Sequence, residues 1–376
     1  MISTFLRSDS GRFRDFRYKV QVINTENMAE NSLINSITES VGERYIDFSV
    51  NINPLSVPDT VKRQFARAAE LSGAYPDPDC RYLCSLLAEK YRIDIGRILC
   101  GNGADDLLYR LVFAVKPKHA VVIEPTYEEY DRVLDLVGCE IQHYTLKAEN
   151  SFTLSEDVLS VLDENCDIAF LCNPNNPTGQ LADSELMMKL IKHCRDKHIL
   201  LVVDECFMEF LPDWEKYSVK EIAAQSDNII VIDAFTKTYS LAGFRLGFCV
   251  SGNAELLDGM RRYGADFAVS VPAQLAGISA LADKEYMQKT HEVISAERDW
   301  LFDKLKKLPL EIYPSTANFL LLKGNEKIRR KLYENGIKVR DCSRFYGLGN
   351  EYCRVAIRTH DDNEKLVKAL EKMLLI

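Results

Sequence analysis

The sequence has no long apolar run and no excess of basic residues. None of its hydrophobic segments approaches the roughly 20 residues that a membrane-spanning helix needs, so no such helix is predicted in the 376 residues. The formal net charge is −9, which argues against nucleic acid or an anionic membrane as the main partner. An anionic substrate would therefore need a local basic pocket.

Signatures of disulfides and metal sites are also missing. The eleven cysteines include no Cys-x-x-Cys pair, and several, such as Cys172 and Cys249, lie in apolar runs. This pattern is typical of a reduced, cytoplasmic protein. The six histidines lack the spacing of metal ligands, and even His193 and His198 do not suit a helical pair. No metal site is predicted.

Residues 1–45 show no clear structural pattern. Their first part is basic and contains aromatic residues, but Asp9 and Asp15 interrupt it, and the apolar core of a secretory signal is absent. We interpret this segment as an N-terminal arm that is solvated or packs against a partner.

Apolar and amphipathic stretches alternate between residues 100 and 250. This alternation predicts an α/β fold with a mostly parallel sheet covered by helices on both faces. Ligands of such sheets bind beyond the carboxyl ends of the strands. The predicted strands are 119–123, 140–144, 167–172, 199–203, 229–233 and 246–251, and the predicted helices between them are 104–114, 126–137, 183–196 and 216–226.

The remaining elements predict a second, smaller α+β domain. One long helix is expected over 272–307, followed by strands at 318–323, 337–340 and 353–357 and helices at 325–335 and 361–374. Near the start, 46–52 alternates like a short strand, and 59–72 and 81–91 have helical spacing. The expected division is an arm at 1–45, a large domain at 46–271 and a small domain at 272–376, with 46–58 contributing to the small domain and the active-site entrance.

Lys237 follows the apolar run 229–232 and is the strongest candidate for a catalytic residue. A lysine at the end of a buried strand is partly desolvated, which favours the uncharged, nucleophilic amine. Thr236 adds a hydroxyl, and Arg245 lies in a glycine-flanked turn where its guanidinium can grip a phosphate. Together these groups suggest pyridoxal phosphate held as a Schiff base.

The motif Thr-Lys-x-Tyr-x-Leu-Ala-Gly-x-Arg-x-Gly at 236–247 resembles the lysine motif of class I/II aminotransferases, the fold type I pyridoxal-phosphate enzymes. The closest resemblance, over roughly 45–376, is to L-threonine-O-3-phosphate decarboxylases and histidinol-phosphate aminotransferases. It implies an aspartate-aminotransferase-like fold with a large pyridoxal-phosphate-binding domain, and an enzyme that acts as a homodimer with shared active sites. A regulator or binding module would require a lost catalytic lysine, but Lys237 and Asp204 are both present.

The resemblance assigns roles to residues at several strand ends. Asp204 would keep the pyridine nitrogen protonated, Tyr127 would stack on the ring, and Asn176 would bind the phenolate oxygen. Lys237, Asp204 and Tyr127 are thus the expected catalytic residues. The phosphate would be held where glycines open a helix and by nearby side chains: Gly103, Ala104, Asp105, Thr236, Arg245 and, from the neighbouring subunit, Tyr75.

The substrate is expected to bind between arginines that clamp its anionic groups. The residues implied are Asn53, Arg340, Arg354 and Arg358. Two positions depart from the aminotransferase pattern: Phe207 replaces a tyrosine that donates to the phenolate, and Ala234 replaces a serine or threonine near the phosphate. Phe207 favours a decarboxylase acting on L-threonine-O-3-phosphate. A transaminase for histidinol phosphate, or for an aromatic or related amino acid, with 2-oxoglutarate as acceptor, stays open.

Overall fold

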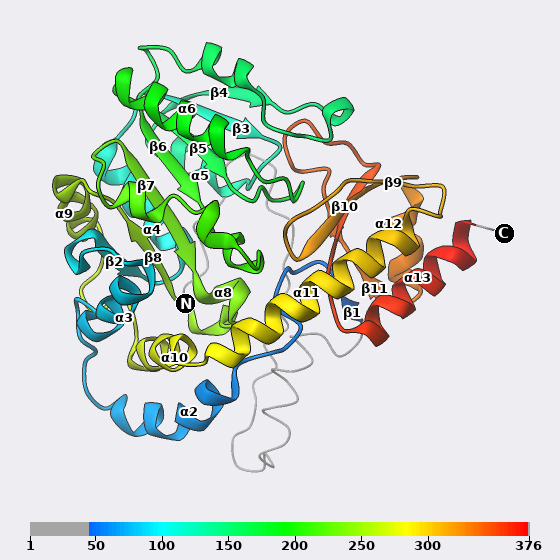
Figure 1. Ribbon diagram of the computed structural model, residues 1–376, viewed down its shortest axis with the longest axis horizontal. Coiled ribbons are helices and arrows are strands. Elements are labelled where there is room, and N and C mark those ends of the chain that lie inside the picture. Colours follow the sequence, from blue (N-terminus) through cyan, green and yellow to red (C-terminus); the bar gives the residue numbers. More distant parts are fainter. Residues whose placement is uncertain (1–44, 375–376) are drawn as a thin grey trace, which may run out of the picture. The chain divides into compact units, whose positions relative to one another are not determined.

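The computed structural model describes residues 45–374, so the predicted arm lies outside the described residues except for Tyr45. Its elements are arranged around a seven-stranded sheet (Figure 1). Five neighbouring strands run parallel, and β8 is antiparallel to both of its neighbours. The strand order is β2 (Ile98–Gly101), β8 (Gly247–Val250), β7 (Ile229–Ala234), β6 (Leu200–Asp204), β5 (Ile168–Cys172), β3 (His119–Glu124) and β4 (Glu140–Thr145).

Helices cover both faces of this sheet because its central strands are apolar on both sides. Successive residues of a strand point to opposite faces; in β6, Val203 packs into one core cluster and Val202 into the other. The Val203 side is covered by α3 (Arg81–Tyr91), α6 (Ser184–Asp196), α7 (Lys220–Ala223) and α10 (Val271–Leu281). The Val202 side is covered by α4 (Ala104–Val115), α5 (Glu129–Asp135) and α9 (Ala254–Arg262).

A second sheet has four antiparallel strands: β12 (Arg340–Asp341), β13 (Tyr352–Ala356), β10 (Phe319–Lys323) and β9 (Glu311–Ile312). Its buried residues form a further core with α11 (Lys284–Leu305), α12 (Lys327–Glu334) and α13 (His360–Leu374). Beside it, β1 (Ile46–Asp47) pairs in parallel with β11 (Ile337–Lys338). Residues 46–47 thus contact the C-terminal part of the chain.

Several local predictions differ from the structure; the strand expected at 337–340, for example, is two short strands, β11 and β12, in different sheets. The expected helix over 272–307 is two helices, because Asp283 accepts a hydrogen bond from the Tyr286 amide and begins α11 anew. The strand expected at 46–52 is confined to Ile46–Asp47, and the chain then turns. The antiparallel edge strand β2 was not predicted, since it is a run of only four residues.

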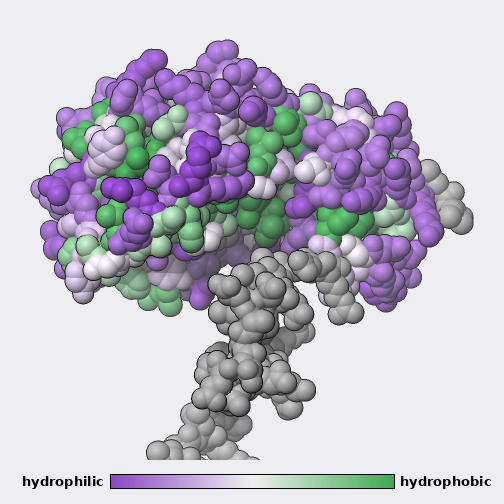
Figure 2. All heavy atoms as spheres, turned by 90° about the horizontal axis from the view of Figure 1, so that it is seen from below, coloured by the Kyte–Doolittle hydropathy of each residue, from purple (hydrophilic) through white to green (hydrophobic). Residues whose placement is uncertain are grey.

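The outer elements include α2 (Asp59–Leu71), which packs against α10. Figure 2 views the side on which these two helices lie in Figure 1, and shows hydrophobic patches within a mostly hydrophilic surface. None of the helices within residues 45–374 combines the length and apolar character required to cross a bilayer.

Candidate active site

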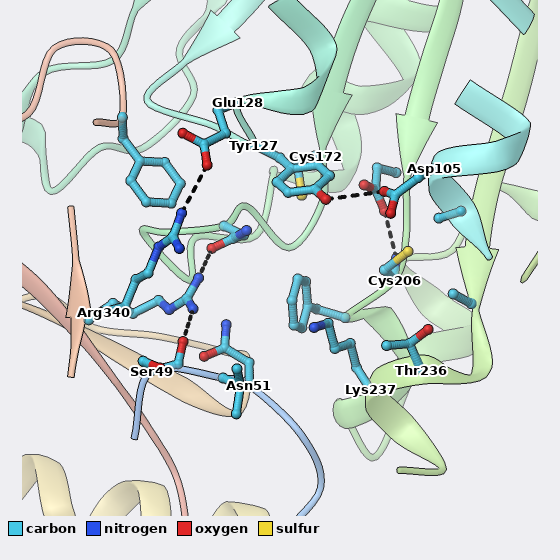
Figure 3. A pocket seen from close by; sticks show the side chains of 18 of the residues that line it. Ser49, Asn51, Asp105, Tyr127, Glu128, Cys172, Cys206, Thr236, Lys237 and Arg340 are labelled. Atoms are coloured by element: carbon cyan, nitrogen blue, oxygen red, sulfur yellow. Dashed lines mark hydrogen bonds and ion pairs between the residues drawn. The ribbon is translucent and has the colours of Figure 1, made fainter. Parts of the chain in front are cut away.

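A cavity of about 380 Å³ lies beyond the carboxyl ends of β5, β6 and β7, where parallel α/β sheets bind ligands. Both sheets contribute to its wall, since Arg340 and Arg354 belong to β12 and β13. In Figure 3, Lys237 and Arg340 approach the opening from different sides. Other lining residues are Ser49, Val50, Asn51, Ala104, Asp105, Tyr127, Glu128, Cys172, Asn176, Asp204, Cys206, Phe207, Ala234, Thr236, Arg245 and Phe345.

Lys237 lies on the short helix α8 (Phe235–Thr238), which begins directly after β7. Its amine has no ion pair within residues 45–374. Burial lowers the pKa of Lys237 to about 8, and the positive charges of Arg354 and Arg245 act in the same direction. A sizeable fraction of Lys237 is therefore uncharged and nucleophilic near neutral pH.

Asp204 ends β6 and is buried, with 7% of its surface exposed. The Tyr130 hydroxyl donates a hydrogen bond of 2.6 Å to its Oδ2 atom, and the Cys206 amide donates one of 3.0 Å to Oδ1. Burial raises the pKa of Asp204, while these hydrogen bonds oppose the shift. No cation pairs with this carboxylate in the described part of the chain, so it can accept a charged N–H group from a ligand.

The N-terminus of α4 forms one corner of the cavity. Gly103 precedes the helix with a φ of +90°, a conformation that favours glycine. A Cβ atom there would lie 2.8 Å from the Arg245 guanidinium, which packs directly over this turn. Arg245 pairs with Asp105 at 3.2 Å, and the Tyr127 hydroxyl donates to Asp105 at 3.1 Å. Helix N–H groups beside an arginine form an anion site.

Arg354 is the most deeply buried cation of the cavity, with 5% of its surface exposed. Its guanidinium contacts the Asn176 side chain, donates to the Ser49 carbonyl at 2.9 Å, and lies 5.2 Å from the Phe319 ring centre. Burial lowers the pKa of Arg354 to about 10. Its Nε atom is buried without a partner, as is Oδ1 of Asn51. Neither atom has a hydrogen-bond partner within residues 45–374.

Arg340 lies nearer the mouth of the cavity and is 36% exposed at its side chain. It pairs with Glu128 at 3.1 Å, and its guanidinium is 5.5 Å from the centre of the Phe345 ring. Glu128 lies between β3 and α5, and Arg340 lies on β12. The ion pair therefore connects a loop of the seven-stranded sheet to the four-stranded sheet.

Comparison with known proteins identifies the family of this chain. The sequence model of the family 'aminotransferase class I and II' matches residues 43–370 of this chain. The chain belongs to the class I and II aminotransferase family. It is 35% identical over 338 residues to the threonine-phosphate decarboxylase of Salmonella typhimurium, covering 88% of this chain and 92% of that protein. Histidinol-phosphate aminotransferase 2 of Archaeoglobus fulgidus is 32% identical over 332 residues, covering 87% and 93%.

A solved structure gives the same result for the fold. The histidinol-phosphate aminotransferase from Clostridium acetobutylicum superposes with a TM-score of 0.82 at 25% identity, covering 87% of this chain and 98% of that one. The predicted fold of the aspartate-aminotransferase type is thereby confirmed. So is the prediction of an enzyme, since this aminotransferase family consists of enzymes that depend on pyridoxal phosphate.

The cavity of this aminotransferase-family protein fits that cofactor on three observations. Asp204 is a buried carboxylate without a cation, as a protonated pyridine nitrogen requires. Gly103 and Arg245 form an anion corner, and the hydroxyl of Thr236 at its edge has no hydrogen bond within residues 45–374. Lys237 has the lowered pKa that Schiff-base formation needs.

The structure brings most of the sequence-predicted site residues to one place, but not all. Tyr127, Asn176, Asp204, Thr236, Lys237, Arg245, Arg340 and Arg354 line the cavity together with Ala104 and Asp105, and Gly103 adjoins it. The departures Phe207 and Ala234 line it as well. Three predicted residues lie elsewhere.

Asn53, Arg358 and Tyr75 do not line the cavity. The Asn53 amide donates to the Thr238 carbonyl and to Thr290, so Asn53 anchors its own loop, and Asn51 faces the cavity instead. Arg358 pairs with Asp362 at 2.9 Å. The Tyr75 side chain is 83% exposed.

Sequence reasoning missed several residues that shape the site. Glu128, Phe345 and Cys206 line the cavity. The Tyr130 hydroxyl donates a hydrogen bond to Asp204. Tyr130 carried a detectable signal, since it follows Tyr127 at the helical spacing of three. No sequence pattern indicated Glu128, because its partner Arg340 lies on a strand about 210 residues later in the chain.

Proposed function

We propose that this protein is a pyridoxal-phosphate enzyme acting on a phosphorylated amino acid, and specifically an L-threonine-O-3-phosphate decarboxylase. The observation that supports it is the presence of two arginines, Arg340 and Arg354, in the cavity that holds Lys237. Threonine phosphate carries a carboxylate and a phosphate, so it offers one anion to each guanidinium. Histidinol phosphate carries only the phosphate.

In this proposal the chain's own residues hold the cofactor and move protons. The α4 N-terminus, Thr236 and Arg245 bind its phosphate, Asp204 keeps a proton on its ring nitrogen, and Tyr127 offers a ring for stacking. When bound, the cofactor withdraws electrons from a bond that breaks at the substrate Cα. The uncharged amine of Lys237 would hold the cofactor, and it would be available as a base for the substrate Cα proton.

The reaction type follows from which bond at Cα is aligned for cleavage. If Arg354 and Arg340 turn the carboxylate into that position, carbon dioxide leaves. If they turn the Cα–H bond there, Lys237 takes the proton and the enzyme transaminates. Phe207, 5% exposed, supplies no hydroxyl to the cofactor, which supports the decarboxylase. The transaminase is the second candidate, supported by the likeness to histidinol-phosphate aminotransferases.

A single-turnover experiment separates the two candidates. The cofactor-loaded protein is mixed with L-threonine-O-3-phosphate or L-histidinol phosphate, and both carbon dioxide and the cofactor spectrum are followed. Carbon dioxide from threonine phosphate with an unchanged cofactor supports the decarboxylase. Conversion of the cofactor to its pyridoxamine form, reversed by 2-oxoglutarate, would instead establish a transaminase. Lys237→Ala is the inactive control for both.

The homodimer and its shared sites also belong to this proposal. The ring centres of Tyr75 and Phe267 lie 4.8 Å apart with the rings tilted, and both side chains are exposed. Further exposed apolar side chains come from α2, α3 and the segment after α9: Phe65, Leu71, Tyr82 and Tyr263. A cluster of this kind suits a second copy of the chain. In such a cytoplasmic dimer Tyr75 would contact the phosphate bound by the partner.

Mixing two inactive variants tests the shared sites. Lys237→Ala and Tyr75→Ala are unfolded together and refolded, so that mixed dimers form. If sites are shared, one site of each mixed dimer contains both native residues and activity returns. If Tyr75→Ala is fully active alone, or light scattering finds a monomer, the shared-site proposal is wrong.

A further inference from the structure

A cluster of three potential metal ligands lies outside the active-site cavity. Glu124 ends β3, Asp131 lies on α5, and His143 lies on β4. The Nε2 atom of His143 is 3.1 Å from Oδ2 of Asp131, and one ligand atom from each residue lies within 4.8 Å of the other two. The cluster thus joins three elements of one sheet edge.

The carboxylates of this cluster have few partners within residues 45–374. Glu124 is only 2% exposed, and its carboxylate has one hydrogen bond, from the Thr126 amide at 2.5 Å. No lysine or arginine within residues 45–374 pairs with Glu124 or Asp131. A buried carboxylate without a cation is unfavourable unless a proton or metal ion neutralises it.

A second observation comes from Asp131. Its Oδ1 atom is buried and has no hydrogen-bond partner in the described residues, although such atoms are nearly always paired. Its other oxygen contacts His143. The cluster is nevertheless reachable, because the side chains of His143 and Asp131 are 19% and 31% exposed.

We propose that Glu124, Asp131 and His143 bind one divalent transition-metal ion, such as Zn²⁺ or Mn²⁺, with water completing its coordination. One imidazole and two carboxylates are a donor set that these ions accept. Tetrahedral ligands with bonds of about 2.0–2.1 Å are roughly 3.3 Å apart. The His143–Asp131 distance already meets this spacing, and a small shift of the Glu124 carboxylate completes it.

The bound ion would brace the segment that leads into the active site. Tyr127 and Glu128, which line the cavity, lie between Glu124 and Asp131 in the chain. The ring centres of His143 and Tyr346 are also 4.1 Å apart. Tyr346 directly follows the cavity residue Phe345 in the chain. No sequence pattern indicates this site, because its ligands come from a strand, a helix and another strand. It does not depend on the proposed reaction.

Isothermal titration of the cofactor-loaded protein with Mn²⁺ and, separately, Zn²⁺ tests the proposal. Mn²⁺ is the more decisive probe because it binds thiolates poorly, and the chain has eleven cysteines. We expect one ion per chain and a rise in melting temperature on binding. His143→Ala, Asp131→Asn and Glu124→Gln should each weaken binding by about tenfold or more, since even outer-shell changes cost about 10–100-fold.

Two other histidines provide matched controls. His119 lies 3.7 Å from Glu140 without a third ligand, and His360 contacts Glu297 and Glu364 from opposite sides of its ring. His119→Ala and His360→Ala should bind the metal like the native protein. Failure of the native protein to bind either ion would overturn the proposal, and so would equal binding by His143→Ala. The partly exposed Asp131→Asn serves if Glu124→Gln does not fold.

Discussion

At the scale of single residues, the chemistry of Lys237 follows from its surroundings. Burial removes water from the amine, and Arg354 and Arg245 add positive charge, so the pKa falls from 10.5 to about 8. At pH 7 about a tenth of such amines is uncharged, against less than a thousandth of exposed lysines. The motif around Lys237 predicted its role, but not the contribution of Arg354, which comes from the other sheet.

This shift predicts the pH dependence of Lys237 labelling. In cofactor-free protein, acetylation of Lys237, measured by peptide mass spectrometry and scaled to its own plateau, should rise with a midpoint near pH 8. Arg354→Gln should move the Lys237 midpoint upward, because it removes a positive charge. A Lys237 midpoint near the ordinary lysine value of about 10.4 would contradict the assignment.

Tyr130 is a second residue whose effect can be measured. It is fully buried and donates to Asp204 at 2.6 Å. Tyr130→Phe leaves the Asp204 carboxylate with Cys206 as its partner within residues 45–374, so we expect the free energy of unfolding to fall by about 1–3 kcal/mol in urea denaturation. Tyr144→Phe is the control, since that hydroxyl is 3.4 Å from Ser155 near the surface. Equal losses in both variants would show that the Asp204 contact contributes nothing.

At the scale of elements, the sequence predicted the central strands well and the helix ends poorly. The strands β5, β6 and β7 are short apolar runs with both faces buried. Such runs are typical of the central strands of a parallel sheet. The boundary between α10 and α11 was missed because the helical spacing continues across it. Asp283 caps α11 at this boundary by accepting a hydrogen bond from the Tyr286 amide, and the amino-acid sequence alone does not show this contact.

Asp283→Ala tests the importance of that boundary. Its carboxylate accepts from the Tyr286 amide and from the Thr60 hydroxyl, each at 3.1 Å. Losing a helix cap costs about 0.5–2 kcal/mol, and we expect a loss of that size in urea denaturation. Asp299→Ala, an exposed site on the same helix with the same change of charge, should stay within about 0.5 kcal/mol. A loss as small as that of Asp299→Ala would mean that α11 needs no cap.

At the scale of the whole described unit, the active site is formed where two sheets meet. Asn176 and Ser49 contact Arg354, and Glu128 pairs with Arg340. The sequence identified both arginines through family resemblance but none of these contacts, because each joins residues far apart in the chain. Glu128 and Arg340 are 43% and 36% exposed, and such pairs contribute only about 0–1 kcal/mol to stability. If Arg340 binds the substrate as proposed, we expect this pair to act mainly by competing with the substrate.

If Arg340 binds the substrate phosphate, Glu128 must first release it. Glu128→Gln should therefore lower KM for L-threonine-O-3-phosphate up to about fivefold, the equivalent of about 1 kcal/mol, with little change in melting temperature. The effect should weaken at high salt, which screens exposed charges. Glu129→Gln is the matched control: it removes the same charge one residue away, where the carboxylate contacts Tyr109 and Arg132. Equal changes in both variants would indicate general electrostatic attraction, whereas a change confined to Glu128→Gln would identify the Glu128–Arg340 pair as the element that the phosphate displaces.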